Sequence, residues 1–108
     1  MIYHLTTLTA WQTAQAQGSS TADSLSSQGF IHCSQAAQVA RSANKFFHGQ
    51  SGLVLLSIAE ERVTAPLKNE NLEGGADLFP HIYGPLNLDA VVKVEPFAAG
   101  ADGVFVFE

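Results

Sequence analysis

The chain has 108 residues, of which 46% are hydrophobic, and this length and composition fit one globular domain over residues 1–108. Its formal net charge of −5 at pH 7 argues against general nucleic-acid binding, because that function needs a clustered basic face. Cys33 is the one cysteine in the sequence, so an internal disulfide and a cysteine-rich zinc site are excluded.

The sequence carries no sign of membrane attachment or export. No apolar run approaches the roughly 20 residues that span a bilayer, and no basic segment followed by a hydrophobic stretch opens the chain. A cytoplasmic protein is therefore expected. The sequence does not indicate an oligomeric state.

The first part of the chain predicts a strand followed by a helix. Residues 2–6 are typical of a short strand. Residues 9–12 have the Thr-x-x-Gln form of a capping box, which predicts a helix that continues to about Gln17. Gly18 is the expected C-cap, because glycine adopts the left-handed conformation without a steric penalty. The serine-rich residues 19–28 predict a connecting loop with a short helical turn.

The next segment combines a short strand with the start of a second helix. Residues 30–33 predict a strand, and alternation along it points His32 away from Cys33. Ser34 is the expected N-cap of a helix over residues 35–47, whose apolar residues recur at three- and four-residue spacing.

The second half of the chain predicts mostly strands. The apolar run 53–58 is typical of a central strand buried on both faces. Residues 63–68 predict a short edge strand, whereas 79–87, with two prolines and a glycine, predict an extended or irregular segment rather than a central strand. Residues 89–95 and 104–107 predict two more strands. The expected fold is α+β, a strongly bent, mostly antiparallel sheet of about five or six strands with two N-terminal helices packed on it.

Three of the four histidines, His4, His32 and His81, lie inside apolar segments. On strands, each ring would share a face with bulky apolar neighbours, which is the setting of a pocket floor. Each ring alone is equally well explained as a buried histidine satisfied by hydrogen bonds, but the three together predict that at least two of them line one pocket. Three imidazoles also suit a catalytic zinc ion, although neither a His-x-His nor a His-Glu-x-x-His spacing accompanies them. Cys33 is expected in the core rather than as a nucleophile.

Three further residues are candidate ligand contacts. Ser34, with the first amides of the following helix, suits a phosphate or carboxylate, and helix capping explains this serine as well. Tyr83 suits stacking on a ligand ring or donating its hydroxyl. Asn87 suits a ligand hydrogen bond or a turn cap.

Six parts of the sequence closely resemble the small bacterial family called domain of unknown function 952. They are residues 2–6 (IYHLT), Trp11, 29–34 (GFIHCS), 43–47 (ANKFF), 53–56 (LVLL) and 79–87 (FPHIYGPLN). The resemblance covers essentially the whole chain, and its motifs are specific.

That family in turn resembles the ADP-ribosyltransferase-like fold, which includes RNA 2'-phosphotransferases and toxins that use NAD. The resemblance implies that His4 contacts a ribose of NAD and that the region from His32 to Ser34 lies near the nicotinamide. NAD is therefore the candidate cofactor. No position matches the catalytic glutamate of the third motif in that fold; the glutamates available are Glu70, Glu73 and Glu95.

These observations predict an enzyme or binding protein for a small nucleotide-like ligand, such as NAD or an ADP-ribosylated or phosphorylated species. His4 and His32 would position a ribose or phosphate. His81 would be a general acid or base or a third polar contact, and Tyr83 would stack on the ligand. Two alternatives stay open: a small-molecule or peptide binding module without turnover, and a metal-dependent hydrolase that uses the three histidines.

Overall fold

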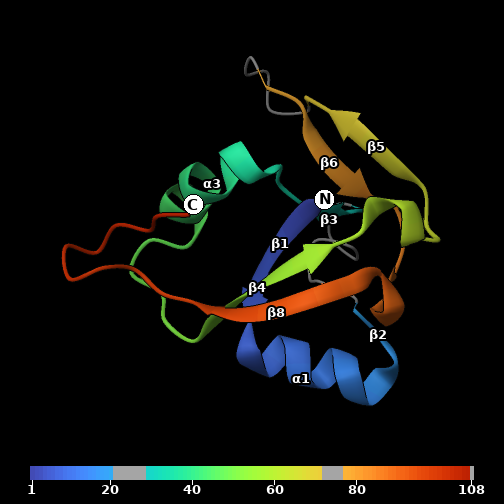
Figure 1. The fold of residues 1–108 in the computed structure, drawn as a ribbon, viewed down its shortest axis with the longest axis horizontal. Coiled ribbons are helices and arrows are strands. Elements are labelled where there is room, and N and C mark those ends of the chain that lie inside the picture. Colours follow the sequence, from blue (N-terminus) through green and yellow to red (C-terminus); the bar gives the residue numbers. More distant parts are fainter. Residues whose placement is uncertain (21–28, 72–76, 108) are drawn as a thin grey trace.

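The structure, a computed structural model, describes residues 1–20, 29–71 and 77–107. In these residues the fold is α+β and every strand pairing is antiparallel. The strands number eight rather than about five or six, and they form three small sheets instead of one bent sheet (Figure 1). Two helices, α1 (Leu8–Gln17) and α3 (Val39–Phe46), lie against them.

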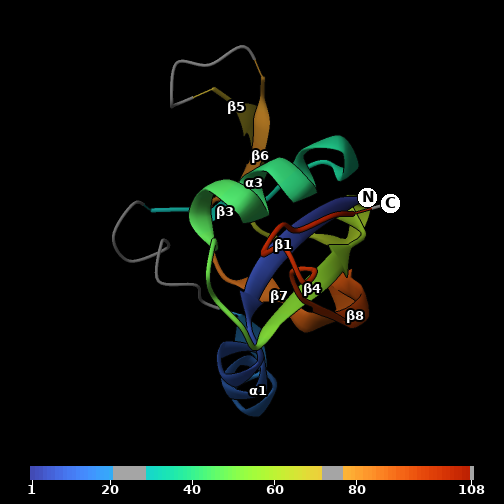
Figure 2. The same cartoon turned by 90° about the vertical axis from the view of Figure 1, so that its left-hand side faces the viewer.

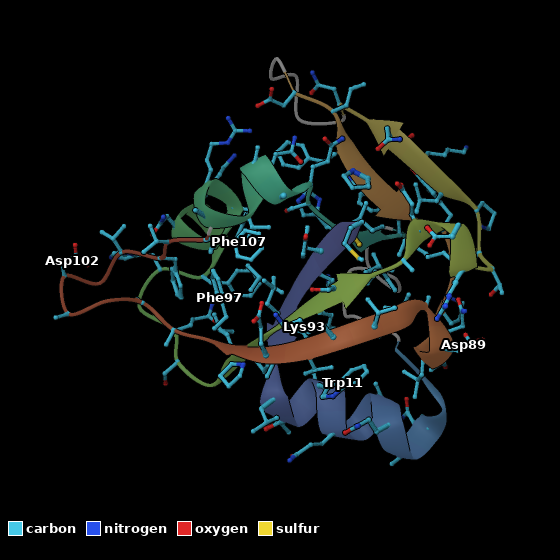
Figure 3. All side chains as sticks on the ribbon, viewed as in Figure 1. Trp11, Asp89, Lys93, Phe97, Asp102 and Phe107 are labelled. Atoms are coloured by element: carbon cyan, nitrogen blue, oxygen red, sulfur yellow. The ribbon has the colours of Figure 1, made fainter. Side chains whose placement is uncertain are left out.

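The two faces of the central sheet pack into two separate hydrophobic clusters. Its strands, in spatial order, are β1 (Ile2–Thr7), β4 (Leu53–Ile58) and β8 (Val91–Phe97). All of β4 is buried, as predicted for a central strand. One sheet face joins the larger hydrophobic cluster, which includes Trp11 of α1 (Figure 3). The other face, with Leu55, packs on Val39 of α3.

A second sheet is attached to the edge of the central one. Its strands, in spatial order, are β3 (Ile31–His32), β6 (Phe79–Ile82) and β5 (Leu67–Glu70). The two sheets meet where Tyr3 and Ser34 exchange two backbone hydrogen bonds of 2.8 Å. The expected edge strand near residues 63–68 corresponds to β5, which lies at the edge of this sheet.

The central position of β6 contradicts the prediction that residues 79–87 are an extended or irregular segment rather than a central strand. Pro80 has no N–H to donate, which normally excludes proline from a central strand. Its carbonyl accepts the N–H of Cys33 at 2.9 Å, so this residue faces β3. β3 ends at His32, so the N–H that Pro80 lacks would lie just beyond the last residue pair of β3 and β6. Little strand pairing is therefore lost.

The first helix begins two residues earlier than the capping box predicts. Thr7 is its N-cap, and its Oγ1 accepts the N–H of Ala10 at 3.0 Å. Thr9 lies inside the helix, where its carbonyl accepts the hydroxyl of Thr13 at 3.1 Å. Gly18 ends the helix as predicted, with a φ of 87°.

The two threonines give a matched test of this helix start. Thr7→Ala is expected to lower the free energy of unfolding by about 1 kcal/mol, because an N–H of the first turn loses its capping oxygen. Thr9→Ala removes an equally exposed side chain that caps nothing, so its effect should be within about 0.5 kcal/mol. Urea denaturation of both variants measures the difference, and a larger loss for Thr9→Ala would contradict the assigned cap.

The prediction that Ser34 is the N-cap of the second helix is wrong. A short 3₁₀ turn, Ala36–Gln38, precedes α3, and the side chains of Gln35 and Gln38 cap it reciprocally. The Ser34 hydroxyl is buried and donates to the Ser42 hydroxyl at 3.2 Å. Ser34 therefore ties the start of this segment to α3 instead of opening a helix N-terminus.

The predicted strand over residues 104–107 is wrong. This segment is irregular and is held by Asn44 of α3, whose Oδ1 accepts the N–H of Phe105 at 2.9 Å and whose Nδ2 donates to the Phe105 carbonyl at 3.0 Å. The Phe105 ring stacks on Phe97 with centroids 5.5 Å apart, and Phe107 meets Tyr3 edge-on at 5.1 Å. The C-terminal segment thus completes the core beneath α3.

The remaining predicted elements are found with shifted bounds. The strand expected at 89–95 is β8, which follows a 3₁₀ turn at Leu88–Ala90. Of the predicted loop at 19–28, residues 21–28 lie outside the described part; Ser19–Ser20 form β2, which pairs with β7 (Leu86–Asn87). Neither described helix is long and apolar enough to cross a membrane.

Candidate functional site

The register of the second sheet brings five side chains to one face. His81 on β6 pairs with His32 on β3 and with Lys68 on β5. Glu70 pairs with Phe79, two positions along the same two strands. Because paired residues and residues two apart share a face of a sheet, all five lie on the same side.

A chain of hydrogen bonds links three of these residues. Nδ1 of His81 lies 3.1 Å from Oε1 of Glu70, and Nε2 of His81 lies 3.1 Å from Nδ1 of His32. The hydroxyl of Tyr83 donates to the same oxygen of Glu70. We call Glu70, His81 and His32 the histidine relay.

The ionised carboxylate of Glu70 determines which ring nitrogens of the histidine relay carry protons. An ionised Glu70 only accepts hydrogen bonds, so the proton of His81 is on Nδ1. The lone pair on Nε2 of His81 then accepts the Nδ1 proton of His32. An imidazole oriented by a carboxylate and in contact with a second imidazole is an arrangement suited to proton transfer.

The shared hydrogen bond moves the pKa values of Glu70 and Tyr83 apart. The bond from Tyr83 is the largest cause that lowers the pKa of Glu70; partial desolvation opposes it, and His81 and Lys68 lower it further. The same bond raises the pKa of Tyr83. Near neutral pH the carboxylate is therefore ionised and the phenol protonated, as the relay requires.

Aromatic rings enclose the two imidazoles. Phe30 stacks on His81 with centroids 4.1 Å apart and 22° between the ring planes. Phe79 and Phe46 contact His32, with centroids 5.2 and 5.9 Å away. His81 is only 3% exposed, whereas His32 is half-buried. His32 is thus the outer imidazole of the pair and His81 the inner one, with Nε2 of His32 itself buried.

Three of the five cationic side chains of the protein lie against the aromatic rings of this site. These pairs are Lys68 with Tyr83 at 5.0 Å, Lys45 with Phe46 at 5.1 Å and Arg41 with Phe79 at 6.0 Å. Arg41 also forms an ion pair with Asp77. The carboxylates of Asp77 and of the ionised Glu70 offset two of these three charges, and the small excess of positive charge that is left, in a chain of net charge −5, suits an anionic ligand.

His4 adjoins the histidine relay without joining its chain of rings. Its Nδ1 donates to the backbone carbonyl of His32 at 2.8 Å. The residue is 7% exposed, and burial lowers its pKa more than the hydrogen bond to His32 raises it. Its Nε2 is buried and has no hydrogen-bond partner among the described residues. The structure therefore brings the rings of His32 and His81 together, with His4 against the backbone of His32.

Because the pKa of His4 is lowered, we expect the free energy of unfolding to decrease in acid. The unfolded histidine takes up a proton near pH 6.5 and the folded one only at a lower pH, so stability falls as pH drops below 6.5, by at most about 1.4 kcal/mol per pH unit. His4→Asn keeps a donor for the His32 carbonyl and cannot titrate. Urea unfolding above and below pH 6.5 should show a shallower acid decline for this variant. An unchanged pH dependence would contradict a buried neutral His4.

The other predicted site residues take structural contacts. Ser34 is bonded to Ser42, as described above. The amide of Asn87 accepts from Thr64 and donates to the Arg62 carbonyl at 2.8 Å, so it braces a neighbouring turn. Tyr83 lies tilted against Phe30, with centroids 5.5 Å apart. Burial raises the pKa of Cys33 to about 12, which agrees with a core residue rather than a nucleophile.

The metal-hydrolase alternative has no ligand set in the part of the chain that the structure describes. Within it, no three His, Cys, Asp or Glu side chains are grouped so that they could hold a metal ion. The Nδ1 atoms of His4 and His32 are directed to a backbone carbonyl and to the other imidazole. These atoms do not converge on one point.

Sequence reasoning missed the role of Glu70. The sequence offers Glu70 as one of the available glutamates, but the edge strand that it predicts ends at residue 68, and it predicts an extended or irregular segment at 79–87 rather than a central strand. No local pattern signals this role, because Glu70 lies opposite Phe79, and Lys68 opposite His81, only through the pairing of β5 with β6. Glu73 lies outside the described residues, and Glu95 lies on β8.

A groove lies on the other face of the central sheet from His4. It has a volume of about 720 Å³ and is lined by Met1, Tyr3, Ser57, Val92, Lys93, Glu95, Pro96, Phe97, Val106 and Phe107. Figure 3 shows Lys93, Phe97 and Phe107 along this side of the molecule. The groove does not include the histidines, so the predicted histidine pocket and this groove are separate features.

Comparisons with known proteins identify relatives over nearly the whole chain. The model of a family described as "Protein of unknown function (DUF952)" matches residues 5–94. The crystal structure of protein CC0527 from Caulobacter crescentus is similar, with a TM-score of 0.88 and 37% identity over 97% of this chain and 92% of that chain. The solution NMR structure of CC0527 gives a TM-score of 0.82 and 38% identity over 95% and 89% of the two chains. No curated protein matches the sequence.

Proposed function

The chain belongs to the DUF952 family, and from that premise we propose that it is an acid–base enzyme for a small anionic ligand of the ADP-ribose class, such as NAD or ADP-ribose. The observation that carries the proposal is the histidine relay, in which Glu70 orients His81 and His81 meets His32 at 3.1 Å. Imidazoles change charge near neutral pH, so this pair can give and take a proton during a transfer or hydrolysis step.

The surroundings of the histidine relay support the choice of ligand. A nucleotide offers a planar base and a charged phosphate. The exposed Phe46 and the half-buried Phe79 and Tyr83 provide rings for stacking, and cations lie over each of these rings. Aromatic stacking combined with positive charge is the recognition mode expected for such a ligand.

Each residue then has a defined role. His32, the outer imidazole, contacts the phosphate or ribose, and His81 acts as the general acid or base through it. Glu70 positions His81. The buried Nε2 of His4 has a lone pair without a partner among the described residues, so a ribose hydroxyl is a fitting donor to it. That last role agrees with the resemblance to the ADP-ribosyltransferase-like fold, which we include in the proposal.

A binding module without turnover is the second candidate. Its support is the burial of His81, which is 3% exposed and covered by Phe30. In that reading the inner imidazole fixes the orientation of His32, and the site recognises its ligand without acting on it.

A ligand-observed NMR screen with NAD, ADP-ribose and AMP, with and without a chelator, tests the proposal. We expect saturation transfer from NAD or ADP-ribose that survives the chelator, followed by a product signal on long incubation. Saturable binding without product would favour the binding module over the enzyme. Absence of any signal at millimolar ligand would contradict both.

A further inference from the structure

The strand β8 is an unpaired edge of the central sheet with apolar residues at its exposed centre. In the described residues it pairs with β4 alone, and Figure 2 shows it at the margin of the molecule. Val92 and Val94 are exposed, Val94 by 41%. An edge strand presents backbone groups to which another strand can bind.

The charged residues of β8 are arranged so that they can pair with those of a second copy of the same strand. Lys93 and Glu95 flank Val94 and form an ion pair of 3.3 Å within the chain. If two copies of β8 lie antiparallel with Val94 opposite Val94, Lys93 of each copy faces Glu95 of the other. Opposite charges placed in this way stabilise a strand pair.

Other registers of the same pairing are unfavourable. A shift in one direction by two positions sets Lys93 opposite Lys93, and a shift in the other direction sets Glu95 opposite Glu95. Like charges directly opposite one another are destabilising. A shift by one position places the charged face of one strand beside the valine face of the other. Among registers within two positions of it, the sequence of β8 therefore favours the one centred on Val94.

Pro96 limits the length of the pairing. It has no N–H to donate, and in this register it lies opposite Val92, where the ladder would otherwise continue. Proline and lysine on an edge strand usually discourage uncontrolled association. Here they confine association to a short segment centred on Val94.

The groove beside β8 adds apolar surface to the same region. Met1, Val92 and Val106 line it and are exposed, and Lys93 and Glu95 form its border with the strand edge. A two-fold axis perpendicular to the sheet at Val94 sets the grooves of two copies on the same face, next to each other. Their exposed apolar residues then adjoin the strand pairing.

We infer that the protein forms a symmetric dimer in which β8 pairs with β8 of a second copy, with Val94 on the two-fold axis. The dimer joins the three-stranded sheets of the two copies into one continuous antiparallel sheet. It does not depend on the ligand proposed for the histidine relay.

Charge exchange on β8 tests the dimer. The wild type is expected to show twice the chain mass of 11.5 kDa by light scattering after gel filtration, at concentrations up to about 1 mM, where even a weak association is detectable. Lys93→Glu and Glu95→Lys should each be monomeric, because like charges oppose each other in the register centred on Val94. Mixing these two variants should restore a dimer, since each supplies the charges that the other lacks.

Two controls separate pairing from unfolding. Circular dichroism should show both single variants folded, and Glu61→Lys, which changes an exposed residue in the 3₁₀ turn after β4, should remain a dimer. A wild type that stays monomeric throughout the concentration range overturns the inference. So does a dimer that persists in both single variants, or a mixture of the two that stays monomeric.

Discussion

Phe105→Ala is expected to lower the free energy of unfolding by about 3–5 kcal/mol, the range for deleting a buried phenylalanine ring. Phe105 is 1% exposed and stacks on Phe97. Its backbone is fixed by both polar atoms of the Asn44 side chain, so the surrounding structure has little freedom to fill the cavity. Because small domains are stable by only about 5–15 kcal/mol, the variant should be close to unfolding at room temperature.

The neighbouring residue gives the control for this prediction. Val106 belongs to the same segment but is 73% exposed, so Val106→Ala should change stability by no more than about 0.5 kcal/mol. Urea unfolding followed by circular dichroism measures both variants. Equal, small effects would show that the C-terminal segment does not contribute to the core in solution.

His32→Ala is expected to weaken ADP-ribose binding by about 10- to 100-fold, because a hydrogen bond to a charged group contributes about 1.5–3 kcal/mol. His32 is the outer imidazole of the histidine relay and is half-buried, and the thermal midpoint of the variant should also fall, because Nε2 of the buried His81 loses its donor. Isothermal titration calorimetry with ADP-ribose measures the affinity, and thermal unfolding measures the fold.

His48→Ala is the matched control, since His48 is exposed just after α3 and should leave the affinity unchanged. His4→Ala is not a suitable comparison, because it removes the donor to the His32 carbonyl and should also destabilise the protein. An unchanged affinity in His32→Ala, with a lower thermal midpoint, would mean that the imidazole is structural.

The sequence predicts best those elements whose local pattern and tertiary setting agree. The run 53–58 is apolar throughout and becomes β4, buried on both faces. Gly18 ends α1 as predicted, because this role depends only on the left-handed backbone conformation of Gly18 itself. By contrast, Pro80 argues locally against a central strand, and its tolerance depends on where β3 ends. The segment 104–107 has the composition of a strand, but Asn44 binds its backbone groups instead.

The candidate site was predicted in part for the same reason. Alternation along the strands and the family resemblance point to His32 and His81, and the structure places their rings in contact. The carboxylate that orients them was not identified, because Glu70 reaches His81 across a hairpin. Pairing across strands is a tertiary property, and a single sequence gives no direct signal for it.

In the proposed function, the histidine relay binds an anionic ligand of the ADP-ribose class. Long-range ¹H–¹⁵N NMR of the imidazole nitrogens during an ADP-ribose titration tests it most directly, because the exposed His48 serves as a reference within the same molecule. We predict saturable shifts of the His32 and His81 signals, with His81 protonated on Nδ1 before ligand is added and His48 unchanged. Signals of His32 and His81 that stay fixed, or that move no more than those of His48, would contradict the claim.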